Sequence, residues 1–127
     1  RQRELESIKV AIRDELGEIE TTIHNMHEVW ETAKVLSSSY ITDLLGNTTA
    51  FDNLRTRLFL ISDEELRKKI VIFYKKLKDT SKKSEGKLGT LADTEEARTE
   101  QSSFDNKFQS LAGEAKQLKK DLEPKTN

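Results

Sequence analysis

Hydrophobic side chains recur every third or fourth residue through most of this chain, which is the spacing of an amphipathic α-helix. The longest such stripe predicts a helix from about Glu4 to Leu36. Its apolar positions are Leu5, Ile8, Ile12, Leu16, Ile19, Ile23, Met26, Trp30 and Ala33. Gly17 is the weak position, because glycine inside a helix costs about 1 kcal/mol relative to alanine. Trp30 is the largest residue of the stripe, so we expect it to be a core anchor of this helix.

A shorter, broken helical section should follow. The serines Ser37–Ser39 favour a corner, because their hydroxyls compete for backbone hydrogen bonds. A short helix should then stop at Gly46–Asn47, since both residues tolerate the left-handed conformation. Hydrophobic spacing predicts another helix over Ala50–Ile61, with Thr48 or Thr49 as its cap.

The clearest boundary in the chain is the capping box Ser62–Glu65. In such a box the first side chain accepts from the amide three residues on, and the last side chain reaches back to the first amide. We therefore expect a helix to start at Asp63 and to fade through Lys82–Lys87, where lysines suit the negative end of the helix dipole. Its predicted core positions are Leu66, Ile70, Phe73 and Leu77.

The last predicted helix follows a second capping box, Asp93–Glu96, with Asp93 as the cap. Gly86 and Gly89 bracket a flexible crossing before it. The seam positions of this helix alternate in steps of four and three, a mean period that is typical of a coiled-coil seam. They are Ala97, Gln101, Phe104, Phe108, Leu111, Ala115, Leu118 and Leu122.

Together these elements predict an all-α fold. We expect an antiparallel helical bundle of four helices, in which two long helices flank a shorter, broken section. A chain of 127 residues is long enough for one hydrophobic core, which we assign to residues 1–122. Pro124 cannot continue a helix, so residues 123–127 are expected to form a polar tail.

Charge and composition narrow the function classes. Basic and acidic side chains nearly cancel, leaving a net charge of −1, so no overall field attracts nucleic acid and no nucleic-acid partner is expected. The chain has no cysteine, which excludes a thiolate nucleophile, a disulfide and a cysteine-bound metal. No apolar run is long enough to span a bilayer, so contact with a membrane would need a segment outside this chain.

Four residues of the first helix are candidate metal ligands. Their spacing can place Glu20, His24, His27 and Glu31 on one helix face. A di-iron bundle, however, needs Glu-x-x-His motifs on two helices together with further carboxylates, and these are the only histidines in the chain. We therefore expect a solvated helix face and no metal or other cofactor.

A basic cluster marks the helix predicted after Ser62. Aromatic residues interleave only at Phe73 and Tyr74, which have core or near-core spacing, so a solvated face is favoured over a nucleic-acid site. The cluster comprises Arg67, Lys68, Lys69, Lys75, Lys76, Lys78, Lys82, Lys83 and Lys87.

We assign no catalytic residue and expect no enzyme. Ser37–Ser39 have no base and orienting acid in a recognisable pattern, and no glycine-rich phosphate loop follows a strand. The triplet Asn47–Thr49 matches a glycosylation acceptor, but a helix stop at Gly46–Asn47 explains the same residues.

Three segments, Ile12–Leu16, Leu36–Gly46 and Ile70–Leu77, together resemble a loosely defined group of uncharacterised prokaryotic proteins. Those proteins have one N-terminal transmembrane helix followed by a helical soluble domain. The stretch that contains these segments runs from Ile12 to Leu77 and is about half of the chain. The resemblance implies a topology with a spanning helix before Arg1, but it implies no activity and no site residues.

These observations favour a non-enzymatic helical interaction or oligomerisation domain of a larger, membrane-anchored protein, whose partner is another protein or a second copy. Its docking surface would use apolar residues beside the main stripes, namely Val10, Val29, Val35 and Val71. One alternative is a ligand-sensing bundle of a signalling receptor, for which Gln101 is the single polar interruption of the last seam. The other alternative is a metal-dependent helical-bundle enzyme.

The expected side of the membrane is the cytoplasm. Basic residues close to a membrane span are enriched on that side, and Arg1, Arg3 and Lys9 would lie next to the implied span.

Overall fold

The computed structural model describes residues 2–88 and 94–124, and every element within them is helical. The predicted all-α fold is therefore confirmed. The elements are α1 (Gln2–Ala33), α2 (Ser38–Gly46), α3 (Thr49–Leu54), the 3-10 helix η1 (Arg55–Leu60), α4 (Glu64–Leu88) and α5 (Glu95–Asp121). Three predicted features lie outside the described residues: the end of the flexible crossing at Gly89, the helix cap at Asp93, and residues 125–127 of the polar tail.

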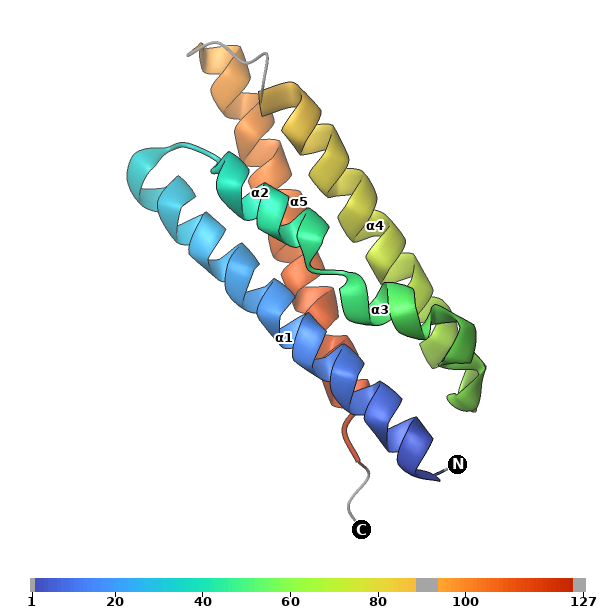
Figure 1. Ribbon diagram of the computed structural model, residues 1–127. Coiled ribbons are helices and arrows are strands. Elements are labelled where there is room, and N and C mark those ends of the chain that lie inside the picture. The colour runs from blue at the N-terminus through green and yellow to red at the C-terminus, as the bar shows by residue number, and fades with distance from the viewer. Residues whose placement is uncertain (1, 89–93, 125–127) are drawn as a thin grey trace.

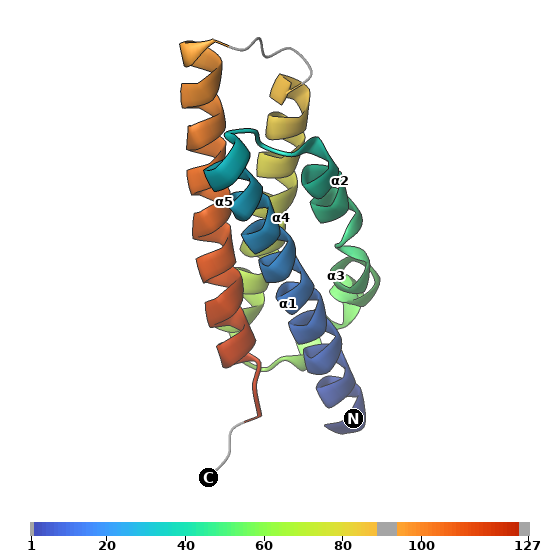
Figure 2. The same cartoon turned by 90° about the vertical axis from the view of Figure 1, so that its left-hand side faces the viewer.

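The helices form an antiparallel bundle in which successive arms run in opposite directions (Figure 1). α1 forms the first arm, and α2, α3 and η1 together form the interrupted second arm. α4 and α5 form the third and fourth arms. α1 packs against α5 and against the second arm, while α4 closes the bundle between them. Figure 2 shows α2 and α3 on the side of α1 that lies away from α5.

One contiguous apolar cluster fills the space between the arms. The stripe of α1 from Ile8 to Met26 is buried in it as predicted, because residues three and four apart share a helix face. Trp30 is also buried, with 7% of its surface exposed, but it stands outside this contiguous cluster. Trp30 is therefore an anchor at one end of the bundle rather than part of its main core.

α1 ends at Ala33, earlier than the predicted Leu36. Lys34 adopts a positive φ of 54°, and its amide donates to the Trp30 carbonyl at 2.9 Å. This left-handed cap closes the helix with a residue other than glycine. Leu36 is buried nevertheless, because the chain folds back over the bundle after the cap.

The single helix predicted over Ala50–Ile61 is wrong, because α3 gives way to the 3-10 helix η1. A 3-10 helix has about three residues per turn, so residues three apart lie on the same side. Leu58 and Ile61 are both buried in this way, and the Ile61 amide donates to the Leu58 carbonyl at 2.9 Å. The tighter winding turns Leu58 and Ile61 inward at the end of the second arm, whereas Phe59 between them is exposed.

The cap of α4 is Asp63, where Ser62 was predicted. The Leu66 amide donates to Asp63 Oδ1 at 3.2 Å, and the helix begins at Glu64. A carboxylate at this position also suits the positive end of the helix dipole.

α4 does not fade through Lys82–Lys87 but continues to Leu88, so the bundle has three long helices rather than two. Ser81 and Ser84 extend its buried stripe beyond Leu77. The Ser84 hydroxyl donates to the Ser81 carbonyl at 3.0 Å, which satisfies that hydroxyl inside the bundle.

α5 begins with Thr94 as its cap, whose hydroxyl accepts from the Ala97 amide at 3.1 Å. The predicted seam of this helix is buried throughout except at Gln101, which is partly buried. Leu122, the C-cap, is also buried, whereas Glu123 and Pro124 are exposed. Among the described residues, no helix is both long enough and apolar enough to cross a membrane.

Candidate functional site

Glu15 on α1 is a buried carboxylate, with 6% of its surface exposed. Its oxygens accept hydrogen bonds from the backbone amides of Ala50 at 2.7 Å and Phe51 at 3.1 Å. These amides belong to the first turn of α3, where they have no partner within the helix and carry the positive end of its dipole. Thr48 occupies the cap position of α3 but makes no capping bond. Glu15 therefore caps α3 from a different helix.

Aromatic rings enclose this carboxylate. Phe51 stacks on Tyr74, with ring centroids 4.1 Å apart and an angle of 8° between the ring planes. The Tyr74 hydroxyl is buried and lies beside the Glu15 carboxylate, but it makes no hydrogen bond of acceptable geometry. Burial raises the pKa of Tyr74 far above its usual value, and the negative charge of Glu15 raises it further. Tyr74 therefore stays protonated in the folded protein.

Asp52 joins the start of α3 to α4. Lys78 Nζ donates to Asp52 Oδ1 at 2.7 Å, and the Thr48 hydroxyl donates to Oδ2 at 3.0 Å. The hydrogen bond from Lys78 is the largest of the effects that lower the pKa of Asp52. Asp52 and Lys78 thus link α3 to α4, while Glu15 links α1 to α3, so charged groups around α3 hold three helices together.

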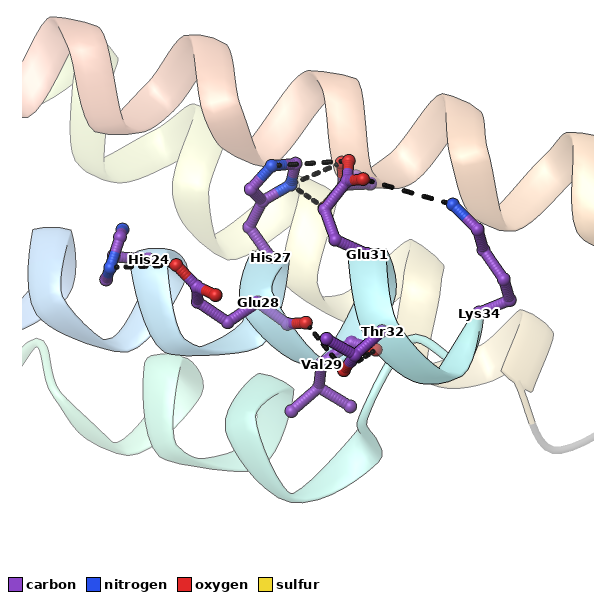
Figure 3. A network of polar contacts seen from close by, with 8 residues as sticks. His24, His27, Glu28, Val29, Glu31, Thr32 and Lys34 are labelled. Atoms are coloured by element: carbon purple, nitrogen blue, oxygen red, sulfur yellow. Dashed lines mark hydrogen bonds and ion pairs between the residues drawn. The ribbon is translucent and has the colours of Figure 1, made fainter.

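The structure does not gather the four candidate metal ligands of α1 into one site. His24 is exposed and pairs with Glu28 at 3.4 Å, whereas His27 pairs with Glu31 at 3.5 Å. Figure 3 shows His27 and Glu31 reaching towards α5, with His24 beside Glu28 further back along α1. Over residues 2–88 and 94–124, no group of three His, Asp or Glu side chains could hold a metal ion.

His27 instead links α1 to α5. Its Nδ1 lies 2.9 Å and 3.1 Å from the two carboxylate oxygens of Asp105, which is buried with 3% of its surface exposed. A second link joins the same helices, because Lys119 Nζ lies 2.6 Å from Glu20 Oε1. Both links pair a cationic or polar nitrogen with a carboxylate across the helix interface, which is a structural use of these residues.

Gln101 is the polar residue that a ligand-sensing bundle would offer to a ligand. In the structure its side chain makes a contact within the fold instead. Its side-chain oxygen accepts from the Leu36 amide at 3.0 Å and so holds the loop that follows α1. A groove of about 1110 Å³ runs over α1 near Gly17 and Lys119, but it is open to solvent and lined by charges of both signs. Neither feature favours an enclosed ligand site.

The basic cluster of α4 is distributed among acidic neighbours. Lys68 pairs with Glu64 within the helix at 3.4 Å, and Lys78 pairs with Asp52 as described above. Phe73 and Tyr74 are buried, so no aromatic side chain of this cluster is available to stack on a base.

Asn47 is the C-cap of α2 and donates its amide to the Leu44 carbonyl at 3.2 Å, as expected for a helix stop.

The exposed large hydrophobic residues of the described surface differ in part from those predicted. Val10 and Val35 are exposed as expected, whereas Val29 and Val71 are half-buried. The exposed residues that the sequence analysis missed are Phe59 on η1, with 64% of its surface exposed, and Ile72 on α4, with 51% exposed.

Ile72 belongs to a surface formed by two adjacent helices. We define the α4–α5 face as Lys69, Ile72, Lys76, Glu114, Gln117 and Asp121, which surround a hollow of about 300 Å³ over Leu118. Lys76 Nζ lies 3.3 Å from Glu114 Oε1 across the helix boundary, and the Gln117 amide donates to Asp121 at 3.0 Å. The face has an apolar centre, with cations on its α4 edge and anions on its α5 edge.

Two buried carboxylates, Glu15 and Asp105, were not among the residues predicted to be buried. A signal for both was present, because Glu15 lies three residues after Ile12 and four before Ile19 on the apolar stripe. Asp105 likewise lies four residues after Gln101 and three before Phe108. A charged residue at stripe spacing predicts burial with a partner, although it does not name the partner.

Comparison with protein families, with curated proteins and with solved structures gave no match for this chain.

Proposed function

We propose that this chain is a non-enzymatic helical interaction domain of a larger protein, and that the α4–α5 face is its docking surface. The observation that carries the proposal is Ile72, which is 51% exposed and lines a hollow between two helices. Covering apolar surface contributes about 25 cal/mol for each Å² removed from water, so a partner that covers Ile72 would be held in part by the burial of this side chain.

The use of the polar side chains supports a role without catalysis. Glu15, His27 and Gln101 are the polar groups with the most distinctive surroundings, and each one fastens two parts of the bundle together. A general acid, base or nucleophile must instead face a space that a substrate can enter. The docking role needs only the rigid helices that these contacts hold in place.

The proposal includes a membrane anchor for the larger protein, with this domain on the cytoplasmic side. Its support is the resemblance carried by Ile12–Leu16, Leu36–Gly46 and Ile70–Leu77, together with the basic residues Arg3 and Lys9 early in α1. Reporters active on only one side of the membrane, fused to the C-terminus of the full-length protein, test the orientation. Activity of the extracytoplasmic reporter alone would contradict it.

A photo-crosslinking residue placed at Ile72 in the full-length protein, expressed in its own cells, tests the docking surface. We expect a cross-linked species of one discrete mass, because the face is covered by a partner. Val35 is the matched control position, since it is similarly exposed but lies in the loop between α1 and α2. No adduct at Ile72, or the same adducts at both positions, would contradict the proposal.

A further inference from the structure

We infer that the occupant of the α4–α5 face is a second copy of this chain, bound about a two-fold axis that runs parallel to the bundle. The inference rests on the proposed function, because it names the partner of that docking surface. It is carried by the arrangement of charge on the two helices and by the exposed side chain of Ile72 on α4, which lines the hollow beside that charge.

Charge on this face is divided between the helices. α4 carries nine basic and four acidic residues, and Lys69 and Lys76 lie on the face. The facing edge of α5 contributes Glu114 and Asp121. The side chains of Lys76 and Glu114 remain substantially exposed, at 53% and 39%, so their ion pair leaves both able to meet further charges. A surface that carries both signs in separate rows can complement itself.

Two kinds of two-fold axis could bring this face onto itself. An axis perpendicular to the helices would lay α4 on α4 of the second copy, and these strongly basic helices would repel each other. An axis parallel to the helices lays α4 on α5 of the second copy and keeps every residue at its own height. Because Lys76 and Glu114 are paired at one height, each Lys76 then approaches Glu114 of the second copy.

The same axis covers the apolar centre. Ile72 and Leu118 line opposite sides of one hollow, on α4 and on α5 respectively. The parallel axis places Ile72 of each copy over Leu118 of the other. Symmetry makes this contact twice, so the isoleucines of both copies are buried. Lys69 of each copy lies towards Asp121 of the other at the same end of the hollow. Apolar burial at the centre and opposite charges at the rim match the anatomy of a protein interface.

Charge reversal tests this pairing with the 127-residue chain. One variant carries Lys69→Glu and Lys76→Glu, and the other carries Glu114→Lys and Asp121→Lys. Each variant alone brings like charges together across the axis, so we expect its dissociation constant to rise at least tenfold. An equimolar mixture restores opposite charges at both contacts, so we expect a mixed dimer. Sedimentation velocity at concentrations up to about 100 μM would detect a dimer of micromolar affinity.

Two controls keep the outcomes separate. Val10→Ser removes an exposed apolar residue from a different surface and should leave the dimer unchanged, whereas Ile72→Ser should weaken it without changing any charge. Circular dichroism shows whether each variant is folded. A monomeric native chain would overturn the inference, and so would a dimer that survives both reversals or a mixture that stays monomeric. A cross-link from Ile72 to a different protein in those cases would leave the proposed function standing.

Discussion

Buried and partly buried polar side chains in this protein join segments that are far apart in the sequence. Glu15 is separated by 35 residues from Ala50, Leu36 by 65 residues from Gln101, and His27 by 78 residues from Asp105. Each link satisfies a group that its own helix leaves without a partner. A buried polar group that loses its partner costs about 1–3 kcal/mol, so these contacts determine how the helices seat against one another.

Glu15→Ala should lower the free energy of unfolding by about 2–3 kcal/mol, because the buried amide of Phe51 and the partly buried amide of Ala50 lose a charged acceptor. Urea denaturation followed by circular dichroism measures the change. Glu18→Ala is the matched control on the same helix, since Glu18 is exposed and should change the value by less than about 0.5 kcal/mol. Equal effects of the two substitutions would show that Glu15 does not cap α3.

Tyr74→Phe should make the protein less sensitive to alkaline conditions. The pKa of Tyr74 is raised in the folded state above its ordinary value of 10.0, so its contribution to stability is fully present below that pH. As the pH rises above 10.0, the unfolded chain gains the phenolate while the folded protein does not, and stability falls. Denaturant unfolding of the native chain and of the variant at pH values on both sides of this point would test it. Parallel losses of stability would contradict the role of Tyr74.

At the scale of single elements, specific local groups decide where the long helices begin and end. Asp63 and Thr94 accept the first free amides of α4 and α5, and Lys34 closes α1 with a left-handed residue. Between these ends the helices depend on the propensity of their residues and on the stripe that they bury. Glycines inside helices are the positions where propensity can be improved without disturbing that stripe.

Gly17→Ala should raise the free energy of unfolding by about 0.5–1 kcal/mol, because alanine loses less backbone entropy in a helix. An added Cβ would lie 3.8 Å from Lys119 Nζ and 4.0 Å from Lys119 Cδ, which is ordinary van der Waals contact. Thermal and urea unfolding measure the change. Gly86→Ala on α4 is the comparison, since its Cβ would meet no atom within 4 Å. Destabilisation by Gly17→Ala alone would show that α1 and α5 are too close at this point to accept a methyl group.

At the scale of the whole molecule, the two parts of the interrupted second arm pack against different parts of the bundle. α2 and α3 cover different parts of α1 and α4, and the break between them lets Phe51 reach Tyr74 while Glu15 caps α3. Trp30 packs at the end of α1 opposite its N-terminus, apart from the contiguous core.

Trp30→Ala should lower the free energy of unfolding by about 3 kcal/mol. Only 7% of the surface of Trp30 is exposed, so truncating its side chain leaves a cavity. Phe59→Ala is the control for an aromatic deletion, because Phe59 is 64% exposed and should change stability by less than about 0.5 kcal/mol. Trp30 is the only tryptophan, so its emission should shift to longer wavelength when the chain unfolds. Emission of a hydrated indole from the folded protein would contradict its burial.

The sequence by itself determined that the chain is helical and which face of each helix is buried. The stripe from Ile8 to Met26 and the seam from Phe104 to Leu122 are recognisable because a helix repeats over three to four residues, which is a local property of the chain. Small polar residues weaken the same signal, and for that reason the continuation of α4 through Ser81 and Ser84 was not predicted.

Only the tertiary structure decided which groups meet between helices. The stripe spacing of Glu15 predicts burial but not which arm it meets, and the end of α3 that it caps carries no local mark of that partner. The division of the second arm into α3 and η1 likewise depends on how Leu58 and Ile61 fit the core. The composition of the α4–α5 face depends on which helices become neighbours. Contacts between helices depend on many weak packing interactions acting together, so they cannot be predicted from short stretches of sequence.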